Sequence, residues 1–327
     1  MNPTTQQLIE LREQIRSWAK YYLCEGITPT KTPDQCNAPS IGSGDGDSIL
    51  FSAILYYSGE QWAGRTIEQS KDDQGGMWRS PQRLRHRVGE HGIARFSQDQ
   101  MLGVLLYLVA RKNIYHDPNG AREFANHWNS WMANHMSNGL FSLCNWNWTC
   151  PEDMDACVLE DVFVIKGREA MIRHVFDYLG ADSPKKGKWG RRLGDDRNVG
   201  SYFEYLALVN NLSSTGNKFN HHLAQIASLI LQETNDNRIV PVDSHFTNNP
   251  FVLWVNNGRK SDDRIRQLTY DYCFQADASH KNGTNNHNQW TWERSDFDSD
   301  SPVYRNSFGW DCVAMLNLII NRDLSVY

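Results

Sequence analysis

The stretch Ser97-Gln-Asp-Gln-Met-Leu-Gly-Val-Leu-Leu-Tyr-Leu-Val-Ala110 decides the fold class. A short polar turn leads directly into the apolar residues 101–110. A helix that is apolar on all sides must be buried on all sides. Five further segments repeat this arrangement of a small polar or acidic turn before an apolar run, at residues 48–57, 156–165, 202–209, 251–255 and 312–320.

The runs begin at intervals of 47 to 60 residues, which suits one two-helix hairpin per repeat. The segments between them carry apolar stripes at helical spacing, which predict outer helices with one buried face. These stripes are Leu8, Leu11, Ile15 and Trp18; Phe124, Trp128 and Trp131; Met171, Val175 and Tyr178; Phe219, Leu223, Ile226 and Ile230; Ile265, Leu268 and Tyr272. The prediction is an all-α chain folded as an (α/α)6 toroid of six inner and six outer helices.

Residues 1–327 are expected to form a single domain, because each repeat buries its apolar face only against its neighbours. The N-terminal segment 4–23 has the stripe of an outer helix. It is predicted to close the ring beside the C-terminus.

Composition limits the partners. The net charge of −5 leaves no basic excess to neutralise a phosphate backbone, so no nucleic-acid partner is expected. No apolar run approaches the ~20 residues of a membrane span. The polar start lacks a signal-peptide core, which predicts a cytoplasmic protein or one released by lysis, a leaderless route or a particle. Oligomeric state is not indicated.

The chain has 7 cysteines, an odd set without a Cys-x-x-Cys pair, and they are interpreted as small buried apolar residues rather than a disulfide framework. The histidines lack metal-ligand spacing, and His221-His222 are placed on an outer helix. No metal and no cofactor are therefore expected.

Carboxylates recur where inner helices are predicted to begin. Asp45 and Asp47 precede the first run, Asp99 the second and Asp311 the last, while Glu293 lies in the loop that feeds the last. Helix capping explains one carboxylate at each start. In a closed ring these groups would converge at one bowl, which makes Asp99, Glu293, Asp47 and Asp45 candidate catalytic residues.

Tryptophans beside asparagines suggest a sugar-binding surface, since sugar rings stack on aromatic faces while their hydroxyls bind amides. The alternative is that these rings cover the core. Trp146, Trp148, Trp290 and Trp292 lie in two such loops. The turn from Glu68 to Arg79 is expected to be structural, with Arg79 as a candidate ligand contact. The substrate-binding candidates are Trp78, Arg79, Arg95, His287, Trp290, Trp292, Arg294, Tyr304 and Asp311.

The helix pattern of the whole chain resembles the six-hairpin toroids of carbohydrate-active enzymes. The resemblance to the hydrolase branch implies an inverting glycoside hydrolase, in which one carboxylic acid protonates the leaving oxygen and a carboxylate activates water. By position, Glu293 would be the acid and Asp99 or Asp47 the base. The expected partner is a polysaccharide or oligosaccharide.

Two alternatives remain open. The segment Asn285-Asn286-His287-Asn-Gln-Trp290 is similar to an Asn-Asn-His-x-x-Trp segment of alginate-lyase-like toroids. That resemblance implies a lyase acting on a uronic-acid polymer through His287 and Tyr304. The third possibility is a non-catalytic glycan-binding or assembly component, for example of a phage or secretion particle.

Overall fold

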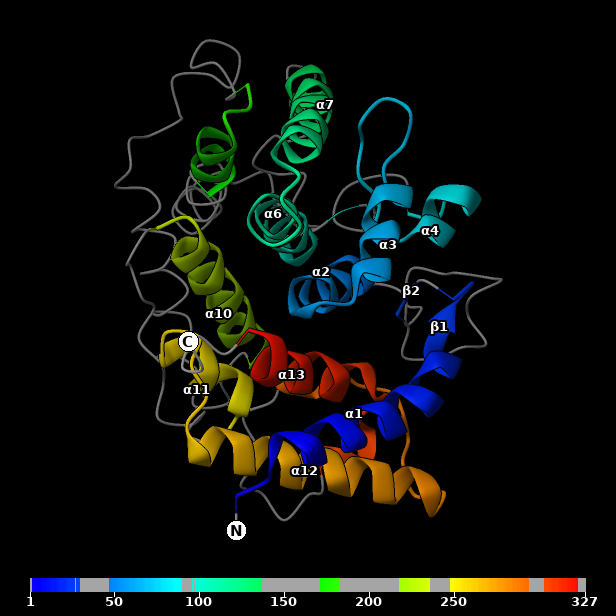
Figure 1. Ribbon diagram of the computed structural model, residues 1–327. Helices are drawn as coiled ribbons and strands as arrows, with labels where there is room; N and C mark the ends of the chain where they lie inside the picture. Colours follow the sequence, from blue (N-terminus) through cyan, green and yellow to red (C-terminus); the bar gives the residue numbers. More distant parts are fainter. Residues whose placement is uncertain are drawn as a thin grey trace, which may run out of the picture.

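Figure 1 shows the chain as a computed structural model. The structure describes residues 2–26, 28–29, 47–89, 96, 98–136, 171–182, 218–235, 248–293 and 303–322. Its named elements are α1 (Thr5–Ala19), η1 (Lys20–Tyr22), β1 (Leu23–Cys24), β2 (Thr28–Pro29), α2 (Ser48–Ser58), η4 (Gln61–Ala63), α3 (Gly64–Gln69), α4 (Pro81–His86), α6 (Gln98–Asn113), α7 (Pro118–Met136), α10 (Lys218–Glu233), α11 (Pro250–Asn256), α12 (Asp263–Lys281), η7 (Thr291–Glu293), η8 (Val303–Asn306) and α13 (Trp310–Asn321). Residues 171–179 are also helical. The all-α class is confirmed.

Four of the six apolar runs fall on described helices, namely α2, α6, α11 and α13. Every side chain of α2 is buried, as are those of α6 from Asp99 to Ala110 and those of α13 from Trp310 to Ile319. The runs at 156–165 and 202–209 lie outside the described residues. The prediction of all-round burial therefore holds for α2, α6 and α13, whereas Leu253 of α11 is only partly buried.

Contacts at their C-terminal ends show that α2, α6, α10 and α13 finish together. Glu233 at the end of α10 accepts a hydrogen bond from the Tyr57 hydroxyl of α2 at 2.6 Å. Its backbone oxygen accepts another from the side chain of Asn113 at the end of α6, at 2.8 Å. The Asn321 amide of α13 lies 3.4 Å from the Ser58 carbonyl of α2.

The same helices also begin together. Gly103 lies so close to α2 that a β-carbon there would come within 2.9 Å of the Leu50 Cα. The ring of Phe51 lies 5.9 Å from that of Phe308, just before α13. These four helices, which we call the central helices, are therefore parallel and occupy the middle of Figure 1. Their common N-terminal end gathers the side chains that begin each helix.

Helix α10 differs from its predicted outer position. It packs against α6, and all its side chains from His222 to Leu231 are buried. The stripe of Leu223, Ile226 and Ile230 marks only part of the buried surface, because the residues between them are small or neutral and are buried too. A helix buried on all sides belongs with the central group.

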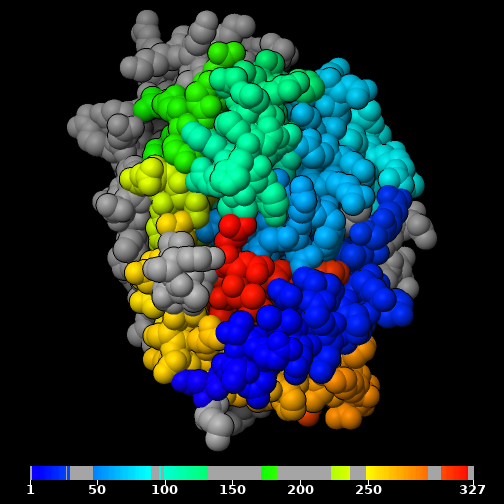
Figure 2. All heavy atoms as spheres, viewed as in Figure 1, coloured from blue at the N-terminus to red at the C-terminus, as the bar shows by residue number. Residues whose placement is uncertain are grey.

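The outer helices run antiparallel to the central ones. Arg12 of α1 donates to the Asn317 side chain of α13 at 3.0 Å, while Trp18 reaches Gly309 at the start of α13. The N-terminal helix thus lies beside the C-terminal helix α13 in the sequence-coloured views (Figure 2). The expected stripes of α1, α7 and α12 face the core, where Leu8, Trp128 and Ile265 are among the buried residues.

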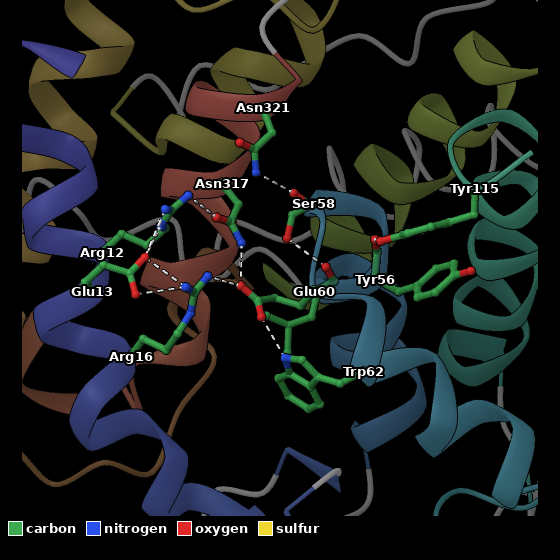
Figure 3. A network of polar contacts seen from close by, with 11 residues as sticks. Arg12, Glu13, Arg16, Tyr56, Ser58, Glu60, Trp62, Tyr115, Asn317 and Asn321 are labelled. Carbon is green, nitrogen blue, oxygen red and sulfur yellow. Dashed lines mark hydrogen bonds and ion pairs between the residues drawn. The ribbon is translucent and has the colours of Figure 1, made fainter. Parts of the chain in front are cut away.

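A buried carboxylate connects several segments near the C-terminal end of the central helices. Glu60, in the turn after α2, accepts hydrogen bonds from Arg16 of α1, from Trp62 at 2.6 Å and from Asn317 of α13 at 2.8 Å (Figure 3). Its oxygens are shared among three donors from three segments. This network joins the first, second and last helices of the chain and leaves Glu60 a structural role.

The cysteines correct the sequence-based interpretation. Cys273 of α12 and Cys312 of α13 form a disulfide, and Cys24 is also disulfide-bonded. Spacing along the chain gave no sign of these bonds, because partners as far apart as Cys273 and Cys312 meet only through helix packing. Among the helices of the described residues, none is long and apolar enough to cross a membrane.

Candidate active site

Asp47 lies at the N-terminal end of the central helices, directly before α2. Its carboxylate is 27% exposed and lies 3.6 Å from the guanidinium of Arg79. Arg79 follows a turn held by Asp72, which accepts hydrogen bonds from the Gly76 amide at 2.8 Å and the Trp78 indole at 3.2 Å. The turn is therefore structural, as predicted, and it brings Arg79 to Asp47.

Asp99 lies in the first turn of α6 and is 5% exposed. Gln100 donates a hydrogen bond from its Nε2 to Oδ2 of Asp99 at 2.6 Å. Since α6 packs against α2 one turn further along, Asp99 and Asp47 lie at the same end of neighbouring parallel helices.

Glu293 is the last residue of η7, which lies at the N-terminal end of the central helices. Thr291 of η7 is bonded to Asp311 at the start of α13, and the Trp292 carbonyl accepts a hydrogen bond from Asn249, the N-cap of α11, at 2.8 Å. Segment η7 also packs against α10. Asp47, Asp99 and Glu293 thus share one end of the central helices, although they come from three distant parts of the sequence.

Asp311, a predicted ligand contact, holds the turns around the start of α13 together. Its side chain is fully buried and accepts hydrogen bonds from both the amide and the hydroxyl of Thr291, from the Ser307 hydroxyl at 2.7 Å and from the Gly309 amide at 3.1 Å. Burial raises the pKa of this carboxyl, against the hydrogen bonds that favour its ionised form. Both oxygens are occupied in holding η7 and the turn before α13.

The tryptophans proposed for sugar stacking are core residues. Trp78, Trp290 and Trp292 are all 0% exposed. Trp290 stacks on Phe51 at 4.8 Å, and the Trp292 indole donates to the Asp311 carbonyl at 2.6 Å. Their faces are covered by protein, so none of the three is open to a sugar ring in this structure. The alternative that loop aromatics cover the core applies to these three.

His287 and Tyr304 are not brought to the three carboxylates in the described structure. The His287 ring lies 2.8 Å from the His280 ring between nitrogens, stacks on Tyr22 at 4.7 Å and meets the edge of Trp18. These partners belong to α1, η1 and α12 on the outside of the central helices. Tyr304, in η8, packs against the apolar core. Among the described residues, His287 therefore lies with His280 rather than with the three carboxylates.

Several predicted site residues lie outside the described residues. They are Asp45, Arg95, Arg294, Trp146 and Trp148.

From the sequence, His222 is placed on an outer helix and has no predicted functional role. His222 of α10 is 0% exposed, and its ring lies 5.5 Å from that of Phe251. Burial lowers its pKa to about 3, and Asp47 is near enough to offset part of that shift. The available signal was the complete absence of Asp, Glu, Lys and Arg between Lys218 and Glu233, which is unusual for an outer helix and typical of a buried one.

Comparisons of the chain with protein-family models, with curated proteins and with solved structures find no match. Function therefore has to be inferred from the side chains at the site. Across the described residues, no three His, Cys, Asp or Glu side chains gather as metal ligands would.

The His287 cluster should make folding sensitive to acid. Burial, with a smaller effect of His280, lowers the pKa of His287 to about 4, below the ~6.5 of an unfolded chain. The folded state therefore binds this proton less readily, and its stability is present above pH 6.5 and lost as pH falls toward 4. We expect the urea midpoint to fall over this range, and to fall less in His287→Asn.

His116→Asn is the matched control, because His116 is exposed and shares the positive φ of His287. Asparagine tolerates that backbone region well. The same acid dependence in both variants would contradict the assignment.

Proposed function

We propose that the chain is a carbohydrate-active enzyme, an inverting glycoside hydrolase whose acid and base are carboxylates at the N-terminal end of the central helices. The observation that carries the proposal is that parallel helices bring Asp47, Asp99 and Glu293 to one end. Inverting hydrolysis needs one carboxylic acid and one carboxylate facing a common sugar bond.

The roles follow from the surroundings of each group. Asp47 lies 3.6 Å from the guanidinium of Arg79 and is assigned as a general base. Asp99, which accepts a hydrogen bond from Gln100, is the second candidate for the base. Glu293, in η7, is assigned as the acid.

The parallel central helices with antiparallel outer partners also support an (α/α)6 toroid for the whole chain, as one domain. In that arrangement α10 takes an inner place instead of the outer one predicted from its stripe. The disulfides favour release from the cytoplasm, because such bonds persist mainly in oxidising surroundings. Free thiols at Cys273 and Cys312 in protein from its native source would contradict release.

A polysaccharide panel tests the activity. Neutral and uronic-acid polymers are incubated with the protein, and both reducing ends and absorbance of unsaturated products are recorded. We expect reducing ends without new absorbance. Absorbance together with reducing ends would indicate a lyase, and binding without either signal would indicate a glycan-binding component; both results would refute the hydrolase.

A further inference from the structure

His222 combines complete burial with two ring nitrogens that have no partner among the described residues. Its side chain has 0% exposure, and neither Nδ1 nor Nε2 makes a hydrogen bond there. Most buried polar atoms in proteins are paired, and an unpaired one destabilises the fold. A polar side chain kept in this position therefore calls for a partner that is not part of the described chain.

The position of His222 points to the candidate active site. Asp47, which precedes α2, acts on the imidazole electrostatically, and the ring of Phe251 at the start of α11 lies 5.5 Å from the imidazole at a tilt of 52°. Asp47 itself is paired with Arg79. The imidazole thus lies next to a proposed catalytic carboxylate without being bonded to it.

Two buried side-chain amides also have polar atoms without a hydrogen-bond partner among the described residues. Gln100, beside Asp99 in the first turn of α6, has an unpaired Oε1, and Gln82, three residues after Arg79, has both amide atoms unpaired within the described part of the chain. Imidazole and amide groups each offer a donor and an acceptor, as sugar hydroxyls do. A uronate would add a negative charge near Asp47 and Asp99, whereas an uncharged sugar would not.

We propose that His222 is a ligand-contacting residue of this site, and that its imidazole donates one hydrogen bond to, and accepts one from, hydroxyl groups of an uncharged sugar. The inference rests on the proposed hydrolase function and adds a residue and a substrate class to it. The lowered pKa keeps the ring neutral at neutral pH, so it serves as a hydrogen-bonding group.

The test compares His222→Leu with Gln225→Leu. Both residues are buried on the same helix, but the Gln225 Oε1 accepts a hydrogen bond from Asn256 at 3.0 Å. The Tm is measured without sugar, and kcat/KM is measured on whichever neutral polymer of the panel is cleaved. We expect His222→Leu to keep or raise the Tm and to lose roughly 10- to 100-fold in kcat/KM. Gln225→Leu should lower the Tm and leave kcat/KM unchanged.

Three results distinguish a failure of the His222 inference from a failure of the hydrolase proposal. A Tm of His222→Leu that falls as far as that of Gln225→Leu would assign the imidazole a structural role. Full kcat/KM in His222→Leu would show that it does not contact the substrate. If the wild-type protein neither cleaves nor binds any polymer of the panel, the hydrolase function and the inference both fail, whereas an active wild type with an unaffected His222→Leu overturns the inference alone.

Discussion

Asp99→Asn should lose roughly 10²- to 10⁴-fold in turnover while its Tm stays nearly unchanged. The substitution keeps the shape of the side chain and an oxygen that can accept the Gln100 hydrogen bond. It removes the negative charge, whose interaction with the start of α6 stabilises the protein by about 1 kcal/mol or less, and replaces one acceptor oxygen by an amide donor. A general base and a helix-terminus charge therefore give clearly different results. Initial rates on a cleaved polymer and thermal unfolding together decide between them.

Asp263→Asn is the matched control. Asp263 also lies in the first turn of a helix, α12, but on the exposed outer side. Its replacement should leave turnover unaltered. Glu293→Gln applies the same comparison to the proposed acid. Full activity in both Asp99→Asn and Glu293→Gln would reject the hydrolase mechanism, even if the central helices are confirmed by experiment.

The sequence predicted which segments are helical better than it predicted which helices pack against each other. Runs such as 101–110 need burial on every side, so α6 follows from composition alone. Helix α10 shows the limit, because neutral residues such as Gln225 and Ser228 look like a solvent-facing side when only the apolar stripe is considered. Their burial depends on what packs against them. The absence of charges was the more informative property.

The candidate site was predictable only in part. Acidic residues at helix starts could be found from the sequence, but Asp47, Asp99 and Asp311 look alike there. Only the contacts separate them, since Asp311 is enclosed by four donors while Asp47 retains exposure. The burial of Trp290 and Trp292 could not be predicted for a similar reason. A loop of Asn and Trp can be folded back over the core, and stacking on Phe51 buries Trp290 completely.

Asp311→Ala should lower the free energy of unfolding by about 3 kcal/mol or more. The substitution leaves the amide and hydroxyl of Thr291 and the hydroxyl of Ser307 without their acceptor, in a place with no exposure to water, while the Gly309 amide keeps the Ser307 oxygen. Each donor left unpaired in a buried site costs about 1–3 kcal/mol, and local rearrangement recovers part of the sum. Urea unfolding monitored by circular dichroism measures the change.

Asp271→Ala provides the comparison, because Asp271 is exposed on α12 and bonds only Gln267 among the described residues, at 2.8 Å. Its loss should change stability by no more than about 0.5 kcal/mol. The two variants also separate structure from chemistry at the start of α13. If Asp311→Ala unfolds like the wild type but has lost turnover, then Asp311 contacts substrate, as the sequence predicted, and the structural role argued from its four donors is wrong. If stability falls while the folded fraction keeps its turnover, Asp311 shapes the turn that presents Glu293 and takes no part in the reaction.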